Sequence, residues 1–248
     1  MATLLLRLAA PLQSWGADSK FEVRQTSRDP SKSGVTGLLA AALGCRRDEL
    51  PEQLKALRMT VRVDQEGSLL DDFHTAQGIE HDAMGRIKLN ADGTLKHDKK
   101  LKFVTHRQYL SDAVFVVALE CEDADYLREL ADALKHPVFP LFLGRRSCPP
   151  TLPLVLGVDE RDAFDALADC LWQASERYRQ RHAGNANEAA LRIVYDAQPG
   201  SVRPNRRDVP LSFNPNRRRY GMRAVTQDIM AIKLQGECTE HDAMSELP

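Results

Sequence analysis

One short loop of the chain combines residue types that bind phosphate. Its members are Gly144, Arg145, Arg146 and Ser147. A glycine lets the backbone approach a ligand closely, and guanidinium and hydroxyl groups donate hydrogen bonds to phosphate oxygens. The alternative is an ordinary basic turn between a helix and a strand. Apolar and proline residues flank the loop, which indicates a shaped loop and favours phosphate binding.

A second basic segment precedes an expected helix. Its members are Arg24, Thr26, Arg28, Ser31, Lys32, Ser33 and Gly34. Free backbone N–H groups at the start of a helix attract anions, and neighbouring basic and hydroxyl side chains add donors. The spacing differs from that of a Walker loop. The same N–H groups serve an ordinary capped helix, with Ser31 or Ser33 as the cap, so anion site and cap are equal alternatives.

An aromatic side chain follows the first expected strand, in the string Gln13-Ser14-Trp15-Gly16. A tryptophan beside a glycine could stack on a nucleic-acid base, with Gln13 as a polar neighbour. The alternative is a hydrophobic plug under the following loop. Position alone favours the plug, because tryptophan is mostly buried in globular proteins.

Two histidines, His74 and His106, flank an expected hairpin and could meet at its base. A histidine pair can supply the acid and base of a ribonuclease reaction. Hydrogen bonding or ligand contact is the more common role for such residues, and we favour it. The chain has no G-x-S-x-G or H-E-x-x-H string and no metal-ligand spacing. We therefore expect no catalytic site, no metal and no cofactor.

The charge of the chain is nearly balanced. Its 248 residues include 34 Lys+Arg and 35 Asp+Glu, a formal net charge of -1. This balance excludes a polycation, so any nucleic-acid binding must use a local basic surface. The five cysteines form no C-x-x-C pair, which predicts reduced thiols in a cytoplasmic protein. No apolar run approaches the ~18 residues of a membrane span.

Hydrophobic periodicity predicts an alternation of strands and helices. Expected strands cover residues 3–10, 59–63, 112–119, 191–195 and 224–234. Expected helices begin near Val35, Asp123 and Phe164, and the last is expected to run on to His182. Between residues 71 and 108 the chain is polar, with turn residues at 90–93, which predicts a projecting hairpin.

The order of these elements predicts an α+β fold, in which a ferredoxin-like, RNA-recognition-type domain carries an inserted β-hairpin thumb. We place that domain at 1–157, with the thumb at about 79–105. Residues 158–248 are expected to form a smaller C-terminal part with a helix and β-strands. An arginine-rich segment at 203–223, in which Asp208 is the only acid, has no assigned role.

Five strings of the sequence together resemble a known family. They are LRLAAPLQSWG at 6–16, PSKSGVTGLLAAALG at 30–44, DDFHTAQG at 71–78, RQYLSDAVFVVAL at 107–119 and LGRRSCPPTLPLVLG at 143–157. In order and spacing, over roughly residues 2–160, they resemble the CasD family. These proteins are the subunits of type I-E CRISPR interference complexes, called Cascade, that hold the 5′ end of the guide RNA.

The resemblance implies a non-catalytic RNA-binding subunit of an antiviral ribonucleoprotein complex. Its ligand would be the 5′ handle of CRISPR RNA (crRNA), contacted by the residues named above together with Arg107, which opens the fourth string. Its protein partners would be the neighbouring backbone subunit and the large PAM-reading subunit. Target DNA would be met only through the assembled complex, and no membrane is involved.

Two other functions remain open. The first is a metal-independent endoribonuclease that processes pre-crRNA, because a related subtype uses such a subunit with a Tyr, a Lys and a His. Here Lys102 and His106 are the nearest candidates, but the adjacent Lys-His pair of that subtype is missing. The second is a small-molecule enzyme with a phosphate site, which the lack of a nucleotide motif disfavours.

Overall fold

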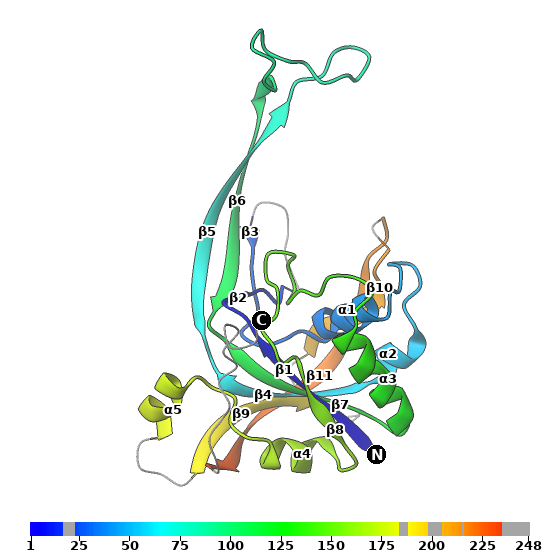
Figure 1. Cartoon of the computed structure of the whole chain (residues 1–248), viewed down its shortest axis with the longest axis vertical. Coiled ribbons are helices and arrows are strands. Elements are labelled where there is room, and N and C mark those ends of the chain that lie inside the picture. Colours follow the sequence, from blue (N-terminus) through cyan, green and yellow to red (C-terminus); the bar gives the residue numbers. More distant parts are fainter. Residues whose placement is uncertain (17–22, 184–187, 198–204, 215, 235–248) are drawn as a thin grey trace, which may run out of the picture.

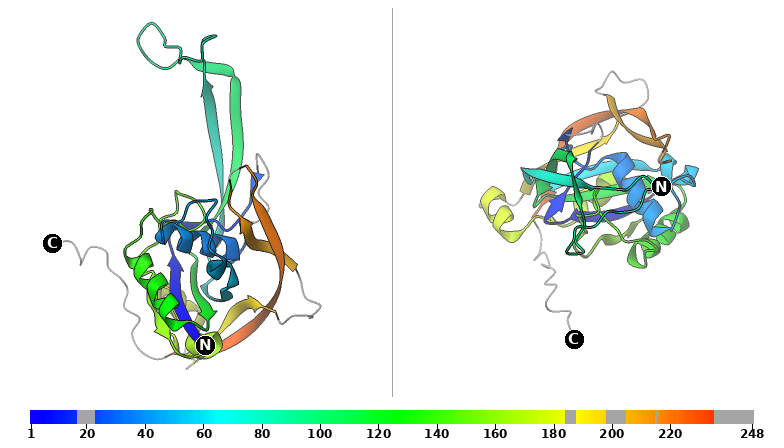
Figure 2. Two further views of the ribbon diagram at one scale, coloured as in Figure 1. Left: turned by 90° about the vertical axis from the view of Figure 1, so that its right-hand side faces the viewer. Right: turned by 90° about the horizontal axis from the view of Figure 1, so that it is seen from above.

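The computed structural model describes residues 1–16, 23–183, 188–197, 205–214 and 216–234. Arg203, Cys238 and the acidic C-terminal end of the sequence lie outside the described residues. None of the described helices is long and apolar enough to cross a membrane. The architecture is mixed α and β with mostly antiparallel strands: a strongly curved sheet forms the body, and one long two-stranded ribbon projects from it (Figures 1 and 2).

The body is built on a seven-stranded sheet in the order β10-β11-β9-β4-β7-β1-β8. Its strands are β1 (Ala2–Ala9), β4 (Arg58–Gln65), β7 (Val114–Cys121), β8 (Val155–Asp159), β9 (Glu188–Asp196), β10 (Asn205–Ser212) and β11 (Arg219–Lys233). All of these neighbours pair antiparallel. The strands predicted at 3–10, 59–63, 112–119, 191–195 and 224–234 are thereby confirmed.

Helices cover both faces of the central strands, which is why β1 and β7 are apolar on both sides. Side chains alternate between the faces of a strand. Leu4 and Leu6 pack into a core with α1 (Lys32–Ala42) and α3 (Ala124–Lys135). Leu5 packs into a second core with α4 (Ala163–Asp169) on the other face (Figure 1). The short helices α2 (Glu52–Ala56) and α5 (Glu176–Ala183) lie at the periphery.

A second sheet carries the projecting ribbon. It contains β2 (Leu12–Gln13), β3 (Val23–Arg24), β5 (Ser68–Ile79) and β6 (His97–Ser111). The strands β5 and β6 pair antiparallel from Ser68 opposite Ser111 outward, so their pairing begins well below the range 79–105. The outer end of the ribbon, residues 80–96, holds only isolated bridges such as that between Leu89 and Leu95. In both figures this ribbon stands far out from the body.

The predicted long helix from Phe164 to His182 is wrong. The structure has two helices here, because α4 ends at Asp169 and α5 starts at Glu176. A buried guanidinium explains the break: Arg62 donates to the carbonyl oxygens of Leu167, Cys170 and Leu171, which binds the end of α4 to β4. The indole N–H of Trp172 then donates to the Asp64 carbonyl oxygen at 2.8 Å, so the connecting chain is part of the core.

The arginine-rich segment contains a strand that periodicity did not reveal. Residues Asn205–Ser212 form β10, an edge strand that pairs with β11. Pro210 is compatible with this position because an edge strand tolerates a missing backbone donor. Through β9 the C-terminal strands continue the same sheet as β4, and the boundary predicted at residue 157 falls within β8.

Candidate nucleic-acid interface

The loop 143–148 is fixed against the end of β2 by its backbone. The Ser14 N–H donates to the Leu143 carbonyl oxygen at 3.1 Å, and the Leu143 N–H donates to the Cys148 carbonyl oxygen at 2.7 Å. Gly144 has a φ of +86°, and a Cβ at this position would overlap the Ser14 carbonyl oxygen. Only glycine meets both conditions, so this residue determines the shape of the loop.

The two arginines of this loop have different surroundings. The Arg145 guanidinium lies over the Tyr109 ring at 4.5 Å from its centroid, and its Nη2 donates to the Arg24 carbonyl oxygen at 2.9 Å. Its Nη1 is buried and has no hydrogen-bond partner among the described residues. Arg146 is exposed, and its side chain makes no hydrogen bond or ion pair with the described residues. Arg145 therefore holds the loop to β6 and β3, while Arg146 is free to meet a ligand.

Tyr109 joins the strand β6 to this loop. Burial raises the pKa of its hydroxyl, but hydrogen bonds with Ser147 and Arg145 and the positive charge of Arg145 outweigh burial and lower the pKa. Sequence reasoning missed Tyr109 as a site residue. The alternation of β6 was the available signal, because residues 107 and 109 of one strand share a face. Arg107 thus lies on the face that carries the Tyr109–Arg145 contact, half-buried, with its Nε donating to Thr105 Oγ1 at 3.3 Å.

At the start of α1 the structure contains both a cap and an anion. Ser31 is the N-cap and accepts from the Gly34 N–H at 3.3 Å. The anion belongs to the protein: the Lys32 N–H donates to the fully buried carboxylate of Asp208 at 2.9 Å. The Lys32 ammonium pairs with Asp196 at 3.3 Å. The predicted phosphate position at these N–H groups is therefore already filled by a carboxylate, which corrects that expectation for Ser31, Lys32 and Gly34.

Arg223 holds this internal anion in place. It donates from Nε and Nη2 to the two carboxylate oxygens of Asp208, at 2.7 and 2.8 Å, and also to Asp196. Burial lowers the pKa of Arg223, but its hydrogen bonds and the charges of both acids outweigh burial and raise it. The pairing links β9, β10 and β11 to α1, which gives Arg223 of the arginine-rich segment a structural role.

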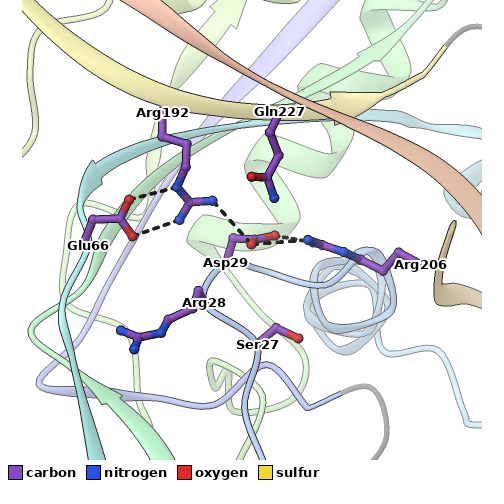
Figure 3. Close-up of a pocket in the computed structure, with 7 residues that line it drawn as sticks. All are labelled: Ser27, Arg28, Asp29, Glu66, Arg192, Arg206 and Gln227. Atoms are coloured by element: carbon purple, nitrogen blue, oxygen red, sulfur yellow. Dashed lines mark hydrogen bonds and ion pairs between the residues drawn. The ribbon is translucent and has the colours of Figure 1, made fainter. Parts of the chain in front are cut away.

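A polar pocket of about 460 Å³ lies beside this segment (Figure 3). It is lined by Ser27, Arg28, Asp29, Glu66, Arg192, Arg206 and Gln227. The buried Asp29 pairs with Arg206 and with Arg192, and Arg192 also binds Glu66 at 2.8 and 2.9 Å. Arg28 stands apart from these ion pairs in Figure 3 and is exposed. Among the described residues that line the pocket, the Arg28 guanidinium is therefore unpaired, while the other charges neutralise one another.

The predicted base-stacking role of Trp15 is wrong. Trp15 is 1% exposed, and its indole N–H donates to Gln13 Oε1 at 3.0 Å. Gln13 is itself buried and donates to the carbonyl oxygens of Ala113 and Leu8. The Thr26 hydroxyl accepts from the Trp15 N–H at 2.8 Å. These residues satisfy each other's polar groups in the core, so Gln13 and Trp15 form the plug that position favoured and offer no surface to RNA.

The two histidines do not meet. In the register of the ribbon, His106 lies opposite Phe73, and His74 lies opposite Thr105. Because successive residues of a strand point to opposite faces, His74 and His106 lie on opposite faces of the ribbon. His106 instead contacts the Phe73 ring edge-on, at 5.4 Å between centroids. This corrects the expectation that the two histidines could act together. Separately, no group of His, Cys, Asp or Glu within the described residues could hold a metal ion.

Comparison with known proteins identifies the family. The family described as "CRISPR-associated protein (Cas_Cas5)" matches residues 3–226. The CRISPR system Cascade subunit CasD of Escherichia coli (strain K12) is 37% identical over an alignment of 169 residues, and the match covers 62% of this chain and 70% of that protein.

Two solved structures support the same family assignment. A chain of a CRISPR RNA-guided surveillance complex is 36% identical, with a TM-score of 0.73 over 93% of this chain and 91% of that one. A crystal structure of a Cas protein is also 36% identical, with a TM-score of 0.64 over 92% and 94% of the two chains. The chain therefore belongs to the Cas5 family of CRISPR-associated proteins.

Proposed function

We propose that this protein is the Cascade subunit that binds the 5′ handle of crRNA, and that it binds without cutting. The observation that carries the proposal is the likeness, over nearly the whole chain, to a chain of an RNA-guided surveillance complex. The geometry of the loop 143–148 also supports the proposal. Its backbone is fixed, and it presents the unpaired guanidinium of Arg146 beside the base of the ribbon.

Exposed cations near this loop suit a single RNA strand. A single strand is held through its phosphates and by ring faces, and it needs donors spaced along a path. The donors without an ion pair among the described residues are Arg24, Arg28 and Arg146, with Arg107 half-buried beside them. Ser33 and the exposed Ser147 add hydroxyl groups. His74, on the Arg107 face of the ribbon, extends this path outward.

The ribbon β5–β6 is the element that we assign to the thumb and to docking of the backbone subunit. Two strands alone have no core of their own and are marginally stable in water. Phe73, Phe103 and Val104 are large apolar side chains of this ribbon and are 62%, 56% and 43% exposed. Apolar surface of this kind marks an interaction site, which fits burial against neighbouring subunits. The large PAM-reading subunit is the second expected partner, and target DNA is met through the complex.

The strand order supports a ferredoxin-like assignment for the N-terminal part. Along the chain β1, α1, β4, β7, α3 and β8 follow the pattern β-α-β-β-α-β, and in the sheet the order is β4-β7-β1-β8. We assign this RNA-binding unit to the N-terminal part of the chain up to the end of β8 at Asp159, and the residues after it to the C-terminal part that extends its sheet.

Absence of cleavage is the sharpest consequence of the proposal. General acid–base cleavage needs one group at the 2′-OH and a second at the leaving oxygen, each within hydrogen-bond reach. The placement of His74 and His106 on opposite faces of the ribbon argues against such a pair. Purified full-length protein with labelled repeat RNA in EDTA tests this point. We expect binding without cleavage, for the wild type and for His106→Ala alike.

Site-specific cleavage by the wild type that disappears in His106→Ala would overturn the non-catalytic assignment and favour the endoribonuclease. Co-expression with the other Cascade subunits tests the partner assignment. We expect the protein to co-purify with them and with crRNA, and failure to do so contradicts the proposal.

A further inference from the structure

Two groups of arginines within the arginine-rich segment differ in their surroundings. Arg206 and Arg223 point inward and pair with Asp29, Asp196 and Asp208. The second group is exposed and lies at the turn that joins β10 to β11: Arg217, Arg218 and Arg219. None of these three side chains has a hydrogen bond or an ion pair with the described residues. The inward group therefore stabilises the fold, whereas the outward group is not used in pairing by the part of the chain that the structure describes.

The sequence around this turn contains no acid that could neutralise it. Between Asp208 and Asp228 the sequence contains no aspartate or glutamate, and Asp208 is fully buried. Some exposed arginines elsewhere in the body do have an acidic neighbour, such as Arg161, which pairs with Asp159. Three adjacent free guanidinium groups repel one another, so the turn has an unusually strong local attraction for an anion.

The turn faces the same side of the body as the candidate RNA site. In Figure 1 and in the left view of Figure 2, the β10–β11 end points in the direction in which the ribbon β5–β6 projects. The strand β3, whose Arg24 carbonyl accepts from Arg145, also lies on that side. A single strand that leaves the 143–148 loop can therefore meet the turn without passing around the body.

We propose that Arg217, Arg218 and Arg219 form a second phosphate-binding site for the same single-stranded RNA, separate from the 143–148 loop. The proposal rests on the proposed function, because it assumes that the chain binds this RNA at all. Guanidinium groups suit the role, since they bind phosphate oxygens in a bidentate manner and stay charged at any physiological pH. A solvated basic turn that only discourages edge pairing of β10 is the alternative.

The test measures how RNA affinity depends on salt. The variant Arg217→Gln/Arg218→Gln removes two charges from the turn, and Arg219 is kept because it pairs with Ser212 in the sheet. The matched control, Arg177→Gln/Arg181→Gln, removes two exposed charges from α5, which lies on another side of the body (Figure 1). A third variant, Arg217→Lys/Arg218→Lys, keeps the charge. Each full-length protein is titrated with single-stranded repeat RNA and with single-stranded DNA of the same sequence.

For single strands the slope of log affinity against log salt changes by about 0.7 per phosphate contact, so we expect the turn variant to flatten the RNA slope by about 1.4. The α5 control and the lysine variant should keep the wild-type slope. An unchanged slope in the turn variant overturns the second site, as does equal flattening by the α5 control. A change that occurs with DNA and not with RNA overturns the choice of RNA.

These failures differ from failure of the proposed function. If the wild type itself binds repeat RNA no better than the matched DNA, the proposed function is wrong and the second site falls with it. If the wild type prefers RNA and the turn variant behaves like the wild type, only the second site is wrong. The melting temperature of each variant is also measured. A value equal to that of the wild type shows that the exposed substitutions leave the fold intact.

Discussion

The guanidinium of Arg145 lies over the ring of Tyr109, 4.5 Å from its centroid, and donates to the Arg24 carbonyl oxygen at 2.9 Å. This contact joins the 143–148 loop to β6 and to β3, three segments that are distant in the sequence. The guanidinium of Arg145 is therefore engaged in holding the loop. The neighbouring Arg146 has no such contact and remains available to a ligand.

Substitution of the two arginines should therefore have different effects on RNA binding and on stability. Arg146→Ala should flatten the salt slope of repeat-RNA binding by about 0.7. It should leave the melting temperature unchanged, because its exposed side chain makes no hydrogen bond or ion pair with the described residues. Arg145→Ala should weaken RNA binding and also lower the melting temperature, because it removes a cation–π contact of about 0.5–1 kcal/mol and a hydrogen bond. Identical melting temperatures for the two variants would contradict this division.

Gly144 should be far less tolerant than another glycine with the same backbone conformation. Gly144→Ala places a Cβ on the Ser14 carbonyl oxygen in addition to the left-handed strain of about 1–2 kcal/mol, so it should destabilise the protein and reduce RNA affinity. Gly93→Ala is the matched control, because Gly93 has a φ of +82° but open space around it. Its RNA affinity should equal that of the wild type. Equal losses in both variants would show that the Ser14 contact is unimportant.

Tyr126 offers a test of stability against pH. Burial raises the pKa of its hydroxyl from the usual 10.0 to about 12, and the hydroxyl has no hydrogen-bond partner among the described residues. The folded form keeps this proton where the unfolded form has lost it, so this contribution to stability is present below pH 10.0 and is lost as the pH rises through about 12.

Tyr126→Phe removes the unpaired hydroxyl and should raise the free energy of unfolding by about 1 kcal/mol at neutral pH. It should also make the alkaline loss of stability less steep. Denaturant unfolding at neutral pH and above pH 10.0 measures both effects. A loss of stability at neutral pH would mean that the hydroxyl has a partner after all.

The outer end of the ribbon should be the first part of the chain that a protease cuts. Arg86, Lys88 and Lys96 are trypsin sites there, all exposed, on a segment that stands away from the core. We expect trypsin to cut at these residues in the isolated protein and to be excluded in the assembled complex, where partners cover the ribbon. Mass spectrometry of the fragments identifies the sites, and equal cutting rates in both states would refute docking of the ribbon.

Local sequence was sufficient for the central strands, for the helices α1 and α3 and for the loop that carries the site. Ser31 as a cap, Asp123 as a cap and the apolar runs of β1 and β7 are encoded within a few residues of each position, because capping and periodicity are local effects. The spacing of Gly144 and its arginines also predicted a shaped basic loop, since a glycine requirement is a local backbone property.

Long-range contacts decided which side chains remain free. The carboxylate at the start of α1 comes from Asp208, which lies 176 residues after Lys32. The strand register set His74 and His106 on opposite faces, and one residue of slip would have changed the face of either. Local sequence patterns specify neither the register of two paired strands nor the residue that a side chain meets across the core. The burial of Trp15, the ion pairs of Arg223 and the lack of a partner for Arg217 among the described residues therefore followed only from the tertiary structure.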